Sequence, residues 1–248
     1  MIRVILLGGG NLASHLATAF FKSSKIELVQ IYNRTLSHIK EKENLVPITD
    51  SLEELLDAHI YVIATSDDAI EKLANKIKSK NGLVVHTSGA IDQSVLQNER
   101  KGVFYPLQSF TKGAKVSFEN IPFCIETDKE DEFILLETLA KALSKKVYPM
   151  DSTQRKKLHT AAVFVNNFVN YMYSIGEDIC EENRIPFEVL YPLIQETANK
   201  IQNLSPKEAQ TGPAKRKDKK TLALHKKELN TEQKIIYQLL SEAISNNR

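Results

Sequence analysis

The first 150 residues alternate short apolar runs with segments in which apolar residues recur at helical spacing. Residues 4–7 form a fully apolar run that ends at three glycines, which is typical of a strand buried on both faces of a parallel sheet. Leu12, Leu16, Ala19 and Phe20 then predict a helix over residues 11–22. Further strands are predicted over residues 27–32, 60–64, 83–86, 103–105, 123–126 and 146–148, and further helices over residues 68–79 and 131–144. This alternation predicts a doubly wound, mostly parallel α/β sheet of the Rossmann type.

One more helix is predicted between the second and third of these strands. Ser51 stands at its start, and Glu54 follows three residues later, which is the spacing of a capping box. We therefore expect a helix to begin at Ser51.

After Pro149 no convincing strand pattern remains. Apolar positions at helical spacing predict one long helix over residues 153–183 and two final helices over residues 218–229 and 231–245. Pro186 can begin the helix that follows the long one, and Pro192 should kink or split it. The change of character near residues 148–152 predicts two domains, a Rossmann domain over residues 1–150 and an all-helical domain over residues 151–248.

Composition and charge narrow the class of protein. Lys plus Arg is 33 and Asp plus Glu is 31, and this near-neutral balance argues against a dedicated nucleic-acid binder. A hydrophobic content of 42% argues against global disorder, and no apolar run approaches the roughly 18 residues of a membrane helix. Cys124 and Cys180 are too few and too far apart for a disulfide scaffold or a metal site. We expect both to be buried in a reduced, cytoplasmic protein.

The segment after the first predicted strand has the pattern G-x-G-x-x-A. Gly8 permits a tight turn, Gly10 lets the backbone approach a pyrophosphate, and the small Ala13 lets the helix pack closely on the strand. Exposed N–H groups and the dipole at the helix start favour phosphate charge, so Asn11 and Leu12 are candidate cofactor-binding residues too. The position after a strand and before a helix predicts a dinucleotide-binding loop rather than a plain glycine-rich turn.

The end of the second predicted strand indicates which dinucleotide is bound. NAD-binding sites usually place an acidic residue there for the ribose 2′-hydroxyl, but this strand ends in Asn33, Arg34 and Thr35, with Ser37 close by. Arg34 could pair bidentately with a 2′-phosphate, and the polar neighbours could donate hydrogen bonds to it. The sequence therefore favours NADP, with a solvated surface charge as the alternative for Arg34.

Two more strand ends should meet at the same edge of the sheet. Thr65 and Ser66 follow the third main strand, and His86 and Ser88 lie at the end of the fourth. Ligands bind outside the carboxyl ends of parallel strands, so these residues should face the nicotinamide. Ser88 could hydrogen-bond a substrate carboxylate or carbonyl. His86 is either a proton donor near neutral pH or a strand-end histidine without chemistry.

Together these residues resemble a known superfamily. The glycine loop, with residues 33–35, looks like pyrroline-5-carboxylate reductase and the deazaflavin-dependent NADP reductases. Later segments resemble a bacterial family that joins a Rossmann-like NADP domain to an all-helical domain of unassigned function: residues 86–90, 105–110, 159–166 and 211–213, with Arg216, Asp218 and His225. The resemblance implies a fold of the 6-phosphogluconate dehydrogenase type, in which the helical domain often forms the dimer.

The chain departs from the related β-hydroxyacid dehydrogenases at their catalytic Lys and Asn. Four residues after Lys156 stands Thr160, and four after Lys157 stands Ala161, so the pair is absent. Prephenate-dehydrogenase-like relatives also tend to have His where this chain has Tyr105. A hydroxyacid mechanism is therefore not carried over.

The helical domain offers other candidates for chemistry. His159 and Asn166 lie seven residues apart and so on one helix face; His159 would be the general acid of a reduction and Asn166 would orient it or the substrate. Arg216 could clamp a substrate carboxylate, and Asp218 could orient Arg216 or cap the next helix. His225 follows Asp218 by seven residues and so lies on the same face of that helix. The neighbouring lysines are interpreted as a solvated basic run.

We therefore predict an NADP(H)-dependent oxidoreductase that transfers hydride between the nicotinamide and a small carbonyl or imine metabolite, and we expect this metabolite to bear a carboxylate. The substrate would lie between Ser88 of the first domain and four residues of the second: His159, Asn166, Arg216 and His225. A homodimer through the helical domain is expected from apolar positions such as 235, 236, 239 and 240. Two alternatives stay open: an NADP-binding sensor or regulatory protein without turnover, and an interaction protein that binds no nucleotide.

Overall fold

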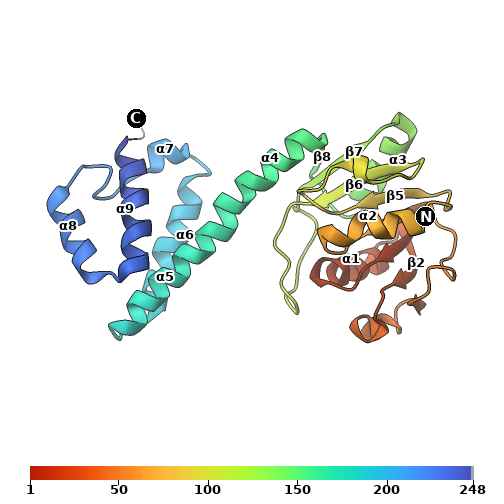
Figure 1. Cartoon of the computed structure of the whole chain (residues 1–248), viewed down its shortest axis with the longest axis horizontal. Coiled ribbons are helices and arrows are strands. Elements are labelled where there is room, and N and C mark those ends of the chain that lie inside the picture. The colour runs from red at the N-terminus through yellow and green to blue at the C-terminus, as the bar shows by residue number, and fades with distance from the viewer. Residues whose placement is uncertain (247–248) are drawn as a thin grey trace. The chain divides into compact units, whose positions relative to one another are not determined.

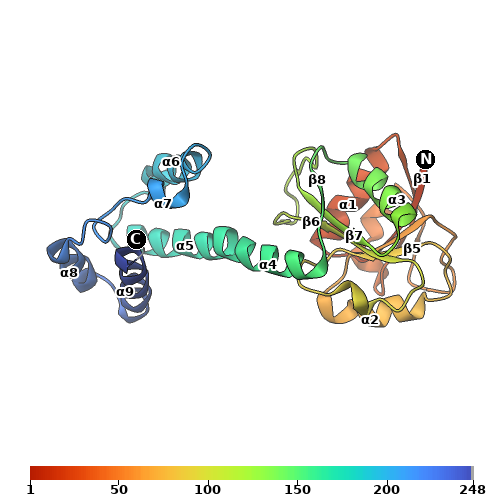
Figure 2. The same cartoon turned by 90° about the horizontal axis from the view of Figure 1, so that it is seen from above.

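The computed structural model describes residues 1–246, and the chain divides into two compact units. The first unit comprises Met1–Val163, and the second begins at Phe164. The first is a sheet covered by helices, and the second consists of helices (Figures 1 and 2). The division falls one helix later than the change near residue 150 that the sequence pattern shows, because the helix after the last strand belongs to the first unit.

The first unit is built on an eight-stranded sheet with the order β3-β2-β1-β4-β5-β6-β7-β8. All neighbouring strands are parallel except β6 and β7, which are antiparallel. The strand order reverses between β1 and β4, which confirms the predicted doubly wound Rossmann sheet and places its switch point there. The strands are β1 (Ile2–Leu7), β2 (Ile26–Tyr32), β3 (Ile48–Thr49), β4 (Ile60–Ile63), β5 (Leu83–His86), β6 (Lys101–Pro106), β7 (Phe123–Thr127) and β8 (Val147–Pro149).

Helices cover both faces of this sheet (Figure 2). Side chains alternate along a strand, so Val4 and Leu6 of β1 face one core cluster while Ile5 and Leu7 face the other. The first cluster includes residues of α1 (Asn11–Lys22) and α3 (Glu130–Lys141), and the second includes residues of α2 (Asp67–Lys76). The fully apolar run of β1 is therefore required by two buried faces.

The prediction that a helix begins at Ser51 is wrong. Residues 51–58 form a turn and an irregular segment. The carboxylate of Glu54, expected to cap the Ser51 backbone, instead accepts a hydrogen bond of 2.7 Å from Thr49 Oγ1. The Ser51 N–H donates to the same Thr49 hydroxyl oxygen, over 3.1 Å. Thr49, in a short strand that the pattern missed, thus takes both groups on which the capping box depends.

The long helix predicted after the sheet is present, with an irregular middle. It comprises α4 (Ser152–Ala162), a π-helical stretch (Val163–Phe168) and α5 (Val169–Glu182). Asp151 caps α4 in a capping box with Gln154. Pro192 splits the next segment as predicted, since a 3₁₀ turn (Phe187–Leu190) precedes α6 (Tyr191–Lys200). The remaining helices are α7 (Pro206–Ala209), α8 (Lys219–Glu228) and α9 (Thr231–Asn246).

An ion pair with a fully buried arginine attaches α4 to the sheet. The Arg155 guanidinium donates to the Glu126 carboxylate on β7 and, over 3.0 Å, to Ser152 Oγ. Nη2, the Arg155 nitrogen that donates to Ser152, also donates to the carbonyl oxygen of Ile91, in the segment after β5. Ser152 also donates to Glu126, from its backbone N–H over 2.9 Å and from its hydroxyl over 2.8 Å. Three donors therefore compensate the desolvation of this carboxylate.

The second unit has little interior of its own. Between Phe164 and Asn246, the described residues that are buried are Cys180, Ala214 and Gln233. Cys180, like Cys124 of the first unit, is a free buried cysteine, as predicted. Large apolar side chains of this unit are instead exposed, among them Phe164, Val165, Val189, Leu193, Ile235 and Leu239.

In the part of the chain that the structure describes, none of the helices combines the length and the apolar character of a membrane span.

Replacing Arg155 tests the attachment of α4. We expect Arg155→Met to lower the free energy of unfolding by about 3–5 kcal/mol, because it leaves the Glu126 charge without its partner. The control Lys157→Met, at an exposed position on the same helix, should stay within about 0.5 kcal/mol of the wild type. Denaturant unfolding monitored by circular dichroism measures both; equal stability of the two variants would contradict the assignment.

Candidate functional site

The glycine loop between β1 and α1 has the geometry that the sequence motif requires. Gly8 has φ +140°, and its N–H donates to the Tyr32 carbonyl oxygen over 2.8 Å. A Cβ atom at Gly8 would lie 2.1 Å from the carbonyl oxygen of Ala64, so the loop can pass β4 only with glycine here.

Gly10 serves a different purpose from Gly8. Its φ of −80° is open to any residue, and a Cβ atom there would meet no atom within 4 Å. Within the described chain, no side chain caps the start of α1, so its first N–H groups face open space. This arrangement suits a bound phosphate group.

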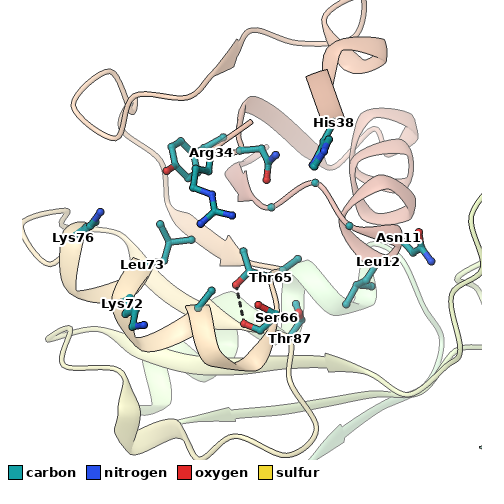
Figure 3. Close-up of a pocket in the computed structure, with 17 residues that line it drawn as sticks. Asn11, Leu12, Arg34, His38, Thr65, Ser66, Lys72, Leu73, Lys76 and Thr87 are labelled. Atoms are coloured by element: carbon teal, nitrogen blue, oxygen red, sulfur yellow. Dashed lines mark hydrogen bonds between the residues drawn. The ribbon is translucent and has the colours of Figure 1, made fainter. Parts of the chain in front are cut away.

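A pocket of about 660 Å³ opens over this loop (Figure 3). It is lined by the carboxyl ends of β1, β2 and β4 and by one face of α2. Eight residues predicted to bind the cofactor lie in it: Gly8, Gly10, Asn11, Leu12, Asn33, Arg34, Thr65 and Ser66. The sequence reasoning missed several others, including Tyr32, His38, Lys72, Lys76 and Thr87.

The charge of the pocket is positive. The Arg34 guanidinium extends from the end of β2 towards α2, which carries Lys72 and Lys76 (Figure 3). Among the described residues, no aspartate or glutamate lines the pocket. The two lysines lie four residues apart on one helix face, beside the buried Leu73. That spacing is the one sequence signal that could have pointed to them.

Asn33 and Thr35, both predicted to bind the cofactor, have different surroundings in the structure. Asn33 Nδ2 donates to the Thr35 carbonyl oxygen over 2.8 Å. A Cβ atom at Gly9 would lie 2.9 Å from Asn33 Cγ, so this side chain packs against the glycine loop. Thr35 is exposed and does not line the pocket.

His86, predicted at the cofactor, does not line the pocket. It is fully buried, and its Nδ1 accepts a hydrogen bond of 3.2 Å from the Ser88 N–H. Burial, together with the nearby charge of Arg155, lowers the pKa of His86 to about 3. The ring is therefore neutral at neutral pH, which favours a strand-end histidine without chemistry over a proton donor.

Ser88 begins a tight turn after β5. Its Oγ accepts hydrogen bonds of 3.1 Å from the N–H groups of Ala90 and Ile91. Because both bonds use the oxygen as acceptor, the hydroxyl hydrogen is left to donate. Ser88 directly follows Thr87, which lines the pocket.

His159 on α4 meets this turn and the end of β6. Its Nδ1 lies 3.0 Å from the hydroxyl oxygen of Tyr105, and the two rings meet edge to face. Gly89 packs against both rings, since a Cβ atom there would lie 2.6 Å from His159 Nδ1 and 2.7 Å from Tyr105 Cζ. The structure thus brings together Ser88 and His159 within the first unit, and adds Tyr105, which the sequence reasoning had noted only as a departure from relatives.

Three other predicted catalytic residues belong to the second unit. Asn166 is exposed in the π-helical stretch, and Arg216 is exposed in the turn before α8. Asp218 caps α8 by accepting from the Thr221 N–H over 3.0 Å. His225 Nδ1 lies 2.8 Å from the hydroxyl oxygen of Tyr237. The roles of Asn166, Arg216 and His225 in substrate binding stay predictions.

The fold and the glycine loop define a Rossmann-type protein with a helical C-terminal part. A family model described as a domain of unknown function, DUF2520, matches residues 121–244, and the chain belongs to that family. A crystal structure from Bacteroides fragilis, provisionally named an NADP oxidoreductase, is 38% identical, with a TM-score of 0.90 over 99% of this chain and 98% of the other.

More distant structures share the fold. A Thermotoga maritima protein is 20% identical, with a TM-score of 0.74 over 97% of this chain and 96% of its own. An imine reductase from Myxococcus stipitatus, in complex with NADP+, is 13% identical, with a TM-score of 0.69 over 98% of this chain and 91% of its own. A comparison with curated proteins gives no match.

The two glycines should respond differently to alanine. Gly8→Ala should destabilise the fold, because the methyl group would overlap the Ala64 backbone. Gly10→Ala should leave the thermal midpoint of unfolding unchanged yet weaken dinucleotide binding at least about tenfold, because its methyl group would occupy the place of the pyrophosphate. Thermal unfolding and fluorescence titration with NADPH separate the effects; unaltered binding by Gly10→Ala would exclude a pyrophosphate at this loop.

Proposed function

We propose that this protein is an NADP(H)-dependent oxidoreductase that transfers hydride between the nicotinamide and the carbon of a small imine or carbonyl compound. The observation that carries the proposal is the pocket itself, which joins an open glycine loop to three cations and, among the described residues, no carboxylate. A dinucleotide with a phosphate on its adenosine ribose matches that distribution of charge. The name given to the Bacteroides fragilis relative agrees with this assignment.

Each part of the cofactor has a partner in the pocket. The N–H groups after Gly10 bind the pyrophosphate, and Arg34 binds the 2′-phosphate through its two parallel donors. Lys72 and Lys76 add positive charge on the facing helix. Thr65 and Thr87, which follow β4 and β5 and line the pocket, would hold the nicotinamide half.

NADPH, when bound, supplies the hydride and is itself oxidised to NADP+. The chain supplies the proton and the orientation of the substrate. The free hydroxyl hydrogen of Ser88 donates to a substrate carboxylate or carbonyl oxygen, and His159 donates the proton to the nitrogen or oxygen of the reduced bond. We keep Asn166, Arg216 and His225 as candidate substrate-binding residues. Arg216 would bind a substrate carboxylate.

A second candidate function is an NADP-binding sensor without turnover. The observation that favours it is the absence of the Lys and Asn pair, since Thr160 and Ala161 stand where the Asn would follow Lys156 or Lys157. The two functions differ in one observable. A screen of keto acids and cyclic imines with NADPH should find oxidation of NADPH if the protein is an enzyme, and binding without oxidation if it is a sensor.

We also propose that the helical unit joins a second copy of the chain. A unit with only three buried residues among those described lacks the core that an independent domain of this size needs. Its exposed apolar side chains on α9, Ile235, Leu239 and Leu240, would find that core in the same surface of a partner.

The mass in solution tests the dimer. At micromolar concentration the protein should sediment at twice the 28.0 kDa mass of the chain. Leu239→Glu should shift the distribution towards the monomer, because it places a charge in the shared apolar surface. Lys234→Glu, at an exposed position of the same helix, should not. A wild-type protein that sediments as a monomer would contradict the proposal.

The Arg34→Ala variant tests the choice of cofactor. We expect it to weaken NADPH binding by about tenfold to a hundredfold, the worth of a hydrogen-bonded charge pair, and to leave NADH binding unchanged. Lys40→Ala, an exposed cation close by that does not line the pocket, is the matched control. Fluorescence titration with both dinucleotides gives the affinities. Equal affinities of the wild type for NADPH and NADH would refute the assignment.

A further inference from the structure

The contact between Tyr105 and His159 joins two parts of the first unit that lie far apart in the sequence. Tyr105 stands near the end of β6 and is 8% exposed, with its ring packed among Val103, Cys124 and Leu158. Its hydroxyl oxygen lies 3.0 Å from Nδ1 of the half-buried His159. One nitrogen of the imidazole ring is therefore engaged by the protein, and the other, Nε2, has no part in this contact.

We propose that Tyr105 is a positioning residue which holds His159 by Nδ1, so that Nε2 is the atom that exchanges a proton with the substrate. The inference rests on the proposed reduction and adds to it the reacting atom of His159 and the residue that orients it. A neutral imidazole that accepts a hydrogen bond at Nδ1 carries its hydrogen on Nε2.

The tyrosine can hold the ring in both of its protonation states. Burial raises the pKa of Tyr105 to about 12, with a smaller contribution from Cys124 and an opposing one from Arg155, so the hydroxyl stays protonated at any pH of interest. Towards a neutral imidazole the hydroxyl donates to Nδ1. Towards an imidazolium its oxygen accepts from Nδ1–H. The contact therefore survives while Nε2 gains and loses its proton.

Two further contacts limit movement of the histidine. Gly89 packs against both rings, at distances that leave no room for a methyl group. Arg155, four residues before His159 and so on the same face of α4, is tied to Glu126 on β7. The ring is thus held from its own helix, from β6 and from the turn that begins with Ser88.

The proton transfer balances the reduction. The substrate carbon takes the hydride, and the electron pair of its double bond moves to the attached nitrogen or oxygen. That atom takes the proton from Nε2, and the imidazolium becomes a neutral imidazole that regains a proton from water. Bound NADPH would be the source of the hydride, with NADP+ as the oxidised product.

The test uses the full-length protein with ¹⁵N-labelled histidine. NMR distinguishes the two neutral forms of an imidazole, and the His159 signals are identified by their loss in His159→Gln. In the wild type, neutral His159 should carry its hydrogen on Nε2 alone. In Tyr105→Phe the signals should report a mixture of both forms, because the partner of Nδ1 is gone. Tyr148→Phe, at an exposed tyrosine of β8, should leave them unchanged.

Kinetics give the second readout. Tyr105→Phe should lower kcat by about tenfold to a hundredfold and leave KM for NADPH within about twofold, since the tyrosine does not line the cofactor pocket. Gly89→Ala keeps the hydroxyl but forces the rings apart, and should lower kcat as well.

The outcomes separate this inference from the proposed function. An active wild type whose His159 signals and kcat are the same in Tyr105→Phe would overturn the positioning role alone. A wild type with the ring held as described, but without NADPH oxidation towards any imine or keto acid, would overturn the proposed reduction and with it the use of Nε2. Loss of both the single form and kcat in Tyr105→Phe supports the proposal.

Discussion

The ion pair between Arg155 and Glu126 is the constraint on which the proposed active site depends. It takes a charged side chain out of water, and hydrogen bonds with Ser152 and the Ile91 carbonyl offset part of the cost of that burial. Those partners come from β7, from the segment after β5 and from the start of α4. The pair therefore holds one face of α4 against the sheet, and His159 follows one turn later on that face.

Burial and the charge of Arg155 also make the two histidines nearest to the proposed substrate different from each other. His86 lies beneath the turn, buried and near Arg155, and is held neutral. His159 is half-buried, and its Nδ1 lies 3.0 Å from the hydroxyl oxygen of Tyr105. Of the two residues that the sequence offered as proton donors, the surroundings favour His159. Residue type alone could not make that choice, because it depends on burial and on a charge from a distant segment.

Much of the fold and about half of the site could be predicted from local patterns. Fully apolar runs such as residues 4–7 are required wherever a strand is buried on both faces, and the glycine loop needs a residue without Cβ at Gly8. Arg34 was found because the end of β2 lacks a carboxylate. These features depend on neighbours in the sequence.

Lys72, Lys76 and Tyr105 were not found, because their surroundings come from other elements of the fold. The helix expected at Ser51 failed for the same reason, since Thr49 in a neighbouring strand took the Glu54 carboxylate.

A crystal structure of the full-length protein with NADP+ would show directly whether the cofactor and the proposed proton donor meet. We expect the 2′-phosphate within hydrogen-bonding distance of the Arg34 guanidinium, the pyrophosphate over Gly10, and the nicotinamide ring beside Ser88 and His159 Nε2. A pocket that stays empty at saturating NADP+, or a nicotinamide ring that points away from His159, would contradict it.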